Sequence, residues 1–139
     1  MARWEIRNVR MAGVSMAVPK NIVRTEDFDF FSPEEAETFN HTVGIRQRHI
    51  APDDVCASDL CFAAAEKLLD ELGWERESVD VLLFESVTGD YRTPPTSCIL
   101  QDRLGLSENC FCVDIPMGCC GCMYAITVAG NLLTTGNVK

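Results

Sequence analysis

The chain has 139 residues, of which 47% are hydrophobic and 24% charged, so it can bury a core of ordinary size as one globular domain. Its formal net charge is −9, and residues 51–139 account for all of it, with five Lys or Arg against fourteen Asp or Glu, whereas residues 1–50 hold seven of each. Because such a surface repels phosphate backbones, we do not expect nucleic acid as a partner.

The first half of the chain predicts a strand, a short helix and an extended basic segment. Alternating apolar residues predict a strand over 4–14, which ends at the turn signal VPKN. Ser32, followed by a proline and acidic residues, predicts a helix that begins there and ends at Gly44. The basic segment GIRQRHIA comes next, at 44–51.

The second half alternates helices with continuous apolar strands, which is typical of parallel strands covered on both faces. The expected elements are a helix over 59–72 capped by Ser58 and ended by Gly73, a strand over 79–87, a helix over 93–105, a strand over 110–115 and a last helix over 119–135. The order of these elements predicts a layered α/β unit.

The last helix lies in a stretch, 115–138, that contains no charged residue. Prolines and glycines at its start and polar residues at its end leave about 14 to 16 helical residues, fewer than the ~20 that a bilayer requires. We therefore expect a helix buried on all sides rather than a membrane span.

Eight cysteines in a chain of this length raise the possibility of a disulfide scaffold. The start, MARWEIRNVRMAG, lacks the apolar run of a signal peptide, so we expect a cytoplasmic protein with reduced thiols. Cys61, Cys98, Cys110 and Cys112 lie among apolar residues of expected strands and helices. There a reduced cysteine acts as a small core side chain.

The other notable cysteines lie in PMGCCGC, where the strand over 110–115 leads into the last helix. Reactive groups gather at the carboxyl ends of parallel strands, and a cysteine in the first turn of a helix has its thiolate stabilised by the helix dipole. Such a thiolate can attack a carbonyl and form a thioester. The alternative is that all three cysteines are small residues that let the helix pack closely.

Clustered cysteines can also serve as a redox pair or as zinc ligands. Cys119 and Cys122 form a C-x-x-C pair at a strand-to-helix junction, as in thioredoxin-type redox proteins. A zinc site would need a second ligand pair, and neither Cys56 with Cys61 nor Cys110 with Cys112 has the required spacing, so we expect no metal.

Four segments, GIRQRHIA, SDLCFAAAEKLL, VLLFESVTGDYRTPPTSCILQDRLGL and VDIPMGCCGCMYAITVAGNLLTTGNVK, together resemble the N-terminal half of a β-ketoacyl-ACP synthase III, a condensing enzyme of the thiolase superfamily. The resemblance implies a thiolase-like layered α/β fold, with a mixed sheet and a buried helix that carries the nucleophile. It also implies that residues 1–139 are one N-terminal domain and that the C-terminal half of such enzymes is absent.

The family's nucleophile pattern selects one of the three cysteines. In this pattern, small residues precede the nucleophilic cysteine. It is followed by one small residue, a glycine and a hydrophobic residue, and usually by a tyrosine two positions after the hydrophobic one. Placed on this chain, the pattern makes Cys119 the nucleophile, with Cys120, Gly121, Cys122 and Tyr124 at the later positions. Cys122 replaces the usual aromatic residue, which implies a roomier substrate site.

The resemblance implies a Claisen condensation in fatty-acid or related acyl-chain biosynthesis. Cys119 takes an acyl group from an acyl-CoA or acyl-ACP, its backbone N–H contributes to the oxyanion hole, and the carbanion from malonyl-ACP attacks the acyl-enzyme. These thioesters are substrates, and no cofactor is expected. The family's catalytic His and Asn belong to the second half, and His41 and His49 match neither, so we expect the chain alone not to complete the reaction.

Some family positions are altered here. The Trp and Arg that hold the adenine of CoA are replaced by Thr38 and Thr42. Arg46 and Arg48 match the motif's basic residues; Arg46 is a candidate CoA contact, and pairing with nearby acids is the structural alternative for both. Thr93 takes the position that reaches into the partner subunit's acyl pocket, and its small size implies a wider pocket.

The resemblance also implies a homodimer in which the strand over 110–115 pairs with its own copy. The uncharged last helix should expose an apolar flank where the absent half would pack. Three function classes remain open: the condensing half of an acyltransferase, a thioredoxin-like C-x-x-C oxidoreductase, and a non-catalytic thiolase-fold fragment.

Overall fold

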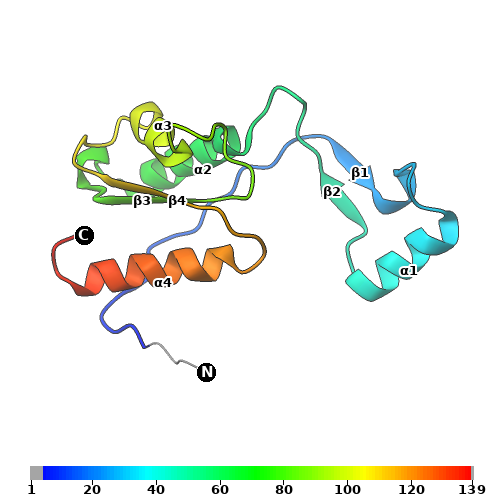
Figure 1. Ribbon diagram of the computed structural model, residues 1–139, viewed down its shortest axis with the longest axis horizontal. Coiled ribbons are helices and arrows are strands. Elements are labelled where there is room, and N and C mark those ends of the chain that lie inside the picture. The colour runs from blue at the N-terminus through cyan, green and yellow to red at the C-terminus, as the bar shows by residue number, and fades with distance from the viewer. Residues whose placement is uncertain (1–4, 139) are drawn as a thin grey trace. The chain divides into compact units, whose positions relative to one another are not determined.

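The computed structural model describes residues 5–138 in two compact units (Figure 1). Of these residues, the larger unit holds 5–16 and 57–138, and the smaller unit holds 17–56. That residues 1–139 act as one N-terminal domain stays a prediction.

The smaller unit consists of one helix and a two-stranded antiparallel sheet. Strand β1, Ile22–Arg24, pairs with β2, Gln47–His49, and helix α1, Pro33–Val43, lies between them in sequence. The predicted helix is confirmed with its signals: the Ser32 side chain accepts from the backbone N–H of Glu35, and Gly44 ends the helix at φ +78°. The sequence missed β1, because three residues carry too little periodicity to be recognised.

The interior of the smaller unit is built on a threonine and a cluster of aromatic rings. Thr25 is fully buried, and its hydroxyl donates to the Ile45 carbonyl at 2.8 Å. The Arg48 guanidinium lies 5.5 Å from the ring centre of Phe28 and 5.2 Å from that of Phe39. Arg48 is therefore held by cation–π contacts, and within the described residues it forms no ion pair with an acid, which was the structural alternative for it.

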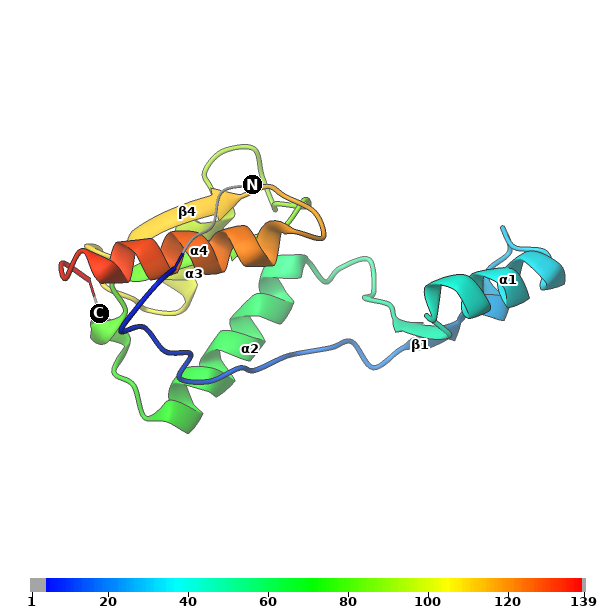
Figure 2. The ribbon, with the colours of Figure 1, turned by 90° about the horizontal axis from the view of Figure 1, so that it is seen from below.

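The larger unit is layered around a parallel pair of strands. Strand β3, Val81–Glu85, pairs with β4, Phe111–Ile115, in a register that joins Val81 to Phe111 and Glu85 to Ile115. Figures 1 and 2 show helices α2, Ala57–Leu72, and α3, Thr96–Arg103, on one face and α4, Gly121–Thr134, on the other. The predicted order of helices and strands in this half is confirmed.

The core of the larger unit lies between α2, α3 and the sheet. Its buried residues are Leu104, Leu106 and Cys110, and its half-buried ones are Phe62, Ala65, Leu69, Val79, Leu82 and Cys112. Arg103 ties the two helices together, since its guanidinium bonds Asp59 at 2.8 Å and lies 4.7 Å from the ring centre of Phe62. Cys110 is buried and Cys98 and Cys112 are half-buried as expected, but Cys61 is exposed, which corrects its assignment to the core.

The predicted strand over 4–14 is wrong for the residues that the structure describes, 5–14; Trp4 lies outside them. In the larger unit β3 and β4 bond each other, and the N-terminal segment packs on helices instead of joining them. A side chain at Gly130 of α4 would meet Ile6, and one at Gly13 would meet Leu68 of α2 at 2.9 Å. Of the alternating apolar residues, Ile6 thus packs against a helix, whereas Met11 and Val14 are 68% and 78% exposed.

Two details of the predicted helices also need correction. Ser58 does not cap α2 but is its second residue, fully buried, with its hydroxyl donating to Asp90 at 2.6 Å. Helix α4 is not buried on all sides: Met123, Tyr124 and Ile126 are at least 42% exposed, and Val128 is 39% exposed. The predicted apolar flank is thus present. Among residues 5–138, no helix combines the length and apolar character needed to cross a membrane.

Asp114, the only charged residue of β4, holds the amino end of α3. Its two carboxylate oxygens accept from the backbone N–H groups of Thr96 and Ser97 at 2.8 and 2.7 Å. Burial raises the pKa of this carboxyl, but the hydrogen bonds from Ser97 and Thr96 outweigh it, so the pKa lies below its ordinary value. The folded protein therefore stabilises the ionised form of the Asp114 carboxyl relative to the protonated form.

We expect Asp114→Asn to lower the free energy of unfolding at pH 7 by about 2 kcal/mol, because an amide cannot accept both hydrogen bonds as an anion does. The carboxylate's contribution is present above the unfolded pKa, near 4, and is lost as the pH falls through the lower folded value. In urea unfolding, the gap between wild type and variant should therefore narrow below pH 4. A gap that is constant between pH 7 and pH 3 would contradict this role.

Candidate active site

The three neighbouring cysteines lie where β4 leads into α4. The backbone N–H of Gly121 donates to the Gly118 carbonyl at 2.8 Å, so Cys119 and Cys120 are the central residues of a tight turn. Cys120 is the N-cap of α4. Cys119 therefore lies just before the helix, not in its first turn as the sequence suggested.

The amino end of α4 presents thiols and unpaired backbone donors to the surroundings. Cys119, Cys120 and Cys122 are all exposed. Met123 and Tyr124 donate their N–H groups to the Cys120 carbonyl, but within the described residues no acceptor pairs with the N–H of Cys119 or Cys122. An exposed thiol beside free N–H donors at a helix amino end is an arrangement that can attack a carbonyl and stabilise the resulting oxyanion.

A carboxylate lies against the same end of the helix. Glu85, the last residue of β3, is half-buried, and a Cβ added to Gly121 would overlap its side chain, meeting Cγ at 2.7 Å with Cδ and Oε1 nearer still. Gly121 is itself buried. A side chain at position 121 would therefore displace Glu85 from the place that it holds beside the turn. Sequence reasoning missed Glu85, although a lone acid at the end of the apolar run VLLF was a usable signal.

The core thiols differ from the exposed ones. Burial, reinforced by the neighbouring Cys110 thiol, raises the pKa of Cys112 to about 12, and burial also raises the pKa of Cys110. Both residues are held between the sheet and the helices α2 and α3. They are therefore structural thiols rather than nucleophiles.

We expect iodoacetamide at pH 8 to modify Cys119, Cys120 and Cys122 in the folded protein and to leave Cys110 and Cys112 unmodified. The thiolate is the reacting species, and at this pH a thiol of pKa about 12 is almost wholly protonated. Peptide mass spectrometry after brief labelling measures this, with urea-unfolded protein as the control in which all eight cysteines react. Rapid modification of Cys112 in the folded state would contradict the assignment.

Thr93 lies in the loop that joins β3 to α3. It is exposed, its hydroxyl donates to the Arg92 carbonyl at 2.9 Å, and its bond to Pro94 is cis. A hollow of about 480 Å³ is lined by residues of this loop and of β4 and by Pro116 just after β4; the loop and strand residues are Ser86, Val87, Gly89, Tyr91, Arg92, Pro95, Cys112, Val113 and Asp114. The loop is fixed by the Ser58–Asp90 bond and by the Thr96 hydroxyl, which accepts from the Asp90 N–H at 3.0 Å.

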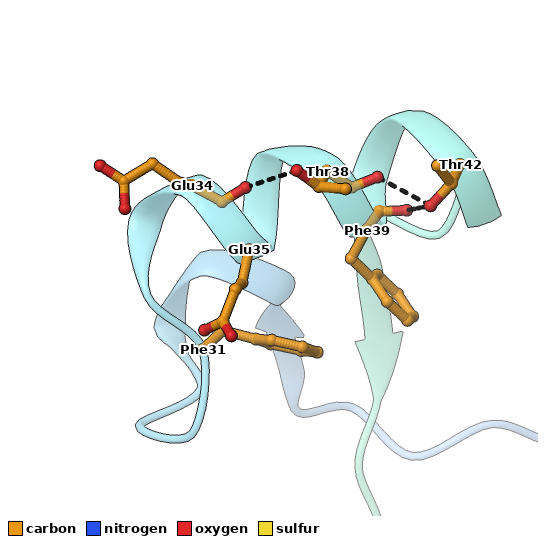
Figure 3. A pocket seen from close by; sticks show the side chains of 6 residues that line it. All are labelled: Phe31, Glu34, Glu35, Thr38, Phe39 and Thr42. Carbon is orange, nitrogen blue, oxygen red and sulfur yellow. Dashed lines mark hydrogen bonds between the residues drawn. The ribbon is translucent and has the colours of Figure 1, made fainter.

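Thr38 and Thr42 line a second hollow, of about 360 Å³, along α1 (Figure 3). Phe31, Glu34, Glu35 and Phe39 complete it. The two threonine hydroxyls donate to the Glu34 and Thr38 carbonyls of their own helix, each at 2.8 Å. They therefore offer neither a free donor nor an aromatic plane.

The remaining predicted residues belong to the smaller unit. Arg46 is exposed, and its side chain makes no ion pair within the described residues. His49 bonds the Pro19 carbonyl at 2.6 Å through Nδ1, which indicates a structural role, and His41 is exposed in the last turn of α1. Within residues 5–138 no three His, Cys, Asp or Glu side chains are grouped as metal ligands.

Comparison with known structures places the fold in a class. A 3-oxoacyl-(acyl-carrier protein) synthase from Burkholderia xenovorans superposes with a TM-score of 0.88 at 38% sequence identity, covering 94% of this chain and 38% of that one. The fold is therefore that of the thiolase-like condensing enzymes, as predicted. No family model matches the chain.

Sequence comparison narrows the class to one family. The chain is 34% identical over 134 residues to the β-ketoacyl-[acyl-carrier-protein] synthase III of Clostridium perfringens, covering 96% of this chain and 41% of that protein. For the synthase III of Geobacillus kaustophilus the identity is 34% over 127 residues, covering 91% and 41%. The chain is thus a homologue of the N-terminal half of β-ketoacyl-ACP synthase III, which confirms the resemblance. It spans about two fifths of the length of these relatives.

Proposed function

We propose that the chain is the nucleophile-bearing half of an acyltransferase of the ketoacyl-ACP synthase III type. The observation that carries the proposal is the exposed Cys119 thiol in the turn before α4, in a chain homologous to that family over 96% of its length. The Cys119 thiolate attacks the carbonyl carbon of an acyl-CoA or acyl-ACP. The bond from that carbon to the donor sulfur breaks, and the donor leaves as a thiolate, which takes a proton from water.

The second half-reaction is the condensation. Loss of CO2 from malonyl-ACP supplies a carbanion, which attacks the Cys119 thioester, releases the cysteine sulfur and forms 3-oxoacyl-ACP. In our proposal the unpaired N–H of Cys119 is one oxyanion donor. Neither His41 nor His49 matches the family's decarboxylation-promoting residues, and we propose that residues 1–139 by themselves accept one acyl group without completing the condensation. The thioesters are its substrates, and we propose no cofactor and a cytoplasmic location.

The donor is proposed to be held by something other than an adenine clamp. In the hollow on α1, the Thr38 and Thr42 hydroxyls bond their own helix, and Glu34 and Glu35 add negative charge that opposes the phosphates of CoA. Arg46, exposed and without an ion pair among the described residues, is the proposed contact for a CoA donor. A carrier-bound acyl chain is thus a suitable donor. Thr93 and Cys122, both exposed, are proposed to border a wide acyl site, Thr93 in that of a partner subunit.

The two alternatives are separated by chemistry. A thioredoxin-like activity would use Cys119 and Cys122, which are both exposed and unpaired, as a dithiol. A non-catalytic thiolase-fold fragment would use none of the three cysteines. The relation to condensing enzymes favours acyl transfer over both.

Intact-protein mass spectrometry tests the proposal. After incubation with short and medium acyl-CoAs and acyl-ACPs, we expect the mass to rise by one acyl group, and the gain to be reversed by hydroxylamine, which cleaves thioesters. No gain with any donor, together with rapid formation of a Cys119–Cys122 disulfide in glutathione buffer, would favour the redox alternative. Release of CO2 from malonyl-ACP by the chain alone would contradict the proposal that the chain accepts an acyl group but does not complete the condensation.

A further inference from the structure

On the face of β3 toward α4, a row of aliphatic side chains ends in an acidic residue, Glu85. Side chains alternate along a strand, so Val81, Leu83 and Glu85 share one face of β3. Val81 and Leu83 line an apolar groove of about 300 Å³ with residues of α4, including Ala125 and Ala129. An aliphatic third member would continue this packing without the cost of removing a carboxylate from water.

Besides burial and the Asp90 charge, the Glu85 charge helps to raise the pKa of the Cys61 thiol, an interaction that does not stabilise the Glu85 carboxylate itself. Within the described residues, no hydrogen bond or ion pair involves Glu85, although its side chain is half-buried. What it does contact is Gly121, the first residue of α4, at the positive end of the helix dipole. The Glu85 carboxylate thus lies at the end of the helix that favours an anion. The residue that it contacts there, Gly121, is two positions after Cys119.

The contact fixes where α4 begins. Glu85 and Ile115 are paired at the carboxyl ends of their strands. Glu85 and the loop to Cys119 therefore lie at the same end of the sheet. The turn from Gly118 to Gly121 then closes on the Glu85 side chain, with no room for a Cβ at its last residue. By contrast, a Cβ at Gly118, the first residue of the same turn, meets nothing within 4 Å.

We propose that Glu85 is a positioning residue for Cys119. Its side chain, packed on Gly121, sets the amino end of α4 and with it the turn that presents the Cys119 thiol. Glu85 itself takes part in no bond-making step. This inference rests on the proposed function, because that function makes Cys119 the residue whose position matters.

The experiment compares Glu85→Ala, Gly121→Ala and the double variant in the purified protein. The rate of Cys119 alkylation by iodoacetamide is measured by peptide mass spectrometry, with Cys56 as the internal reference and circular dichroism as the check of folding. We expect Gly121→Ala to slow Cys119 about tenfold and Glu85→Ala about threefold, because displacement of the turn changes access to the sulfur. The double variant should recover to within about threefold of wild type, since the new methyl group fills space that Glu85 vacates.

Two controls are matched to these variants. Gly118→Ala makes the same change in the same turn without a clash, and Glu108→Ala removes an exposed acid elsewhere; both should leave the Cys119 rate within about twofold. Folded Gly121→Ala that reacts like wild type, or a double variant as slow as Gly121→Ala, would overturn the proposal. Because alkylation needs no acyl donor, this result is independent of the acylation test, whose failure would remove the proposed function instead.

Discussion

Replacing Cys119 by serine is expected to abolish acylation of the protein, lowering its rate with acyl-CoA or acyl-ACP by about a thousandfold or more. A serine hydroxyl is hardly ionised near neutral pH, and among the described residues no hydrogen bond joins the Cys119 side chain to a group that could act as its base. Single-turnover labelling with a radioactive acyl donor, followed over time, measures the loss. The variant should retain its fold, because the Cys119 side chain is exposed.

Cys120→Ser is the matched control for this prediction. Its side chain is exposed and adjacent to Cys119, so it reports any general effect of a serine in the segment. We expect it to keep the acylation rate within about threefold of wild type. Equal loss in Cys119→Ser and Cys120→Ser would leave the nucleophile unassigned. Loss in Cys122→Ser together with a readily formed disulfide would return the C-x-x-C alternative.

The helices were predictable because their signals are local. Ser32 and Gly44 bound α1 by capping chemistry that involves only neighbouring residues, and Gly73 ends α2 in the same way, at φ +62°. The segment over 4–14 misled for the opposite reason. Its alternation predicts a strand, but a strand also requires a partner, and the described residues 5–14 pack on α2 and α4 instead.

The candidate site divides along the same line. Cys119 could be selected from the sequence because the family pattern around it is contiguous. For Glu85 the sequence offers only a lone acid at the end of an apolar run, and its role could not be predicted, since its contact with Gly121 joins residues far apart in the chain and depends on the parallel register of β3 and β4. Ser58 shows the limit of local signals: it resembles a cap in sequence, yet tertiary contact with Asp90 places it inside the helix and buries it.

The second large effect concerns self-association, and it follows from β4. Within the described residues β4 bonds only β3, so its other edge carries unpaired N–H and C=O groups. The segment from Cys110 to Ile115 contains no proline and one charge, Asp114, which already accepts two hydrogen bonds from α3. Nothing along this edge opposes pairing with another strand. We therefore propose a homodimer or larger oligomer with Cys110–Ile115 buried at the contact.

Val113→Lys is expected to convert this oligomer to monomer at micromolar concentration, as measured by light scattering. A two-fold contact brings each substituted residue close to its own copy, so one lysine per chain places two like charges at the interface. Phe111→Lys, at a side chain already 52% exposed, should act in the same direction with less risk to the fold. Leu83→Lys, on the same rung of the sheet but on β3, is the control for a charge facing α4 and should leave association by the β4 edge intact.

A wild-type protein that stays folded and monomeric throughout would remove the proposed dimer. It would also show that the exposed apolar flank of α4, with Met123 63% and Tyr124 55% exposed, is tolerated in water without a covering partner.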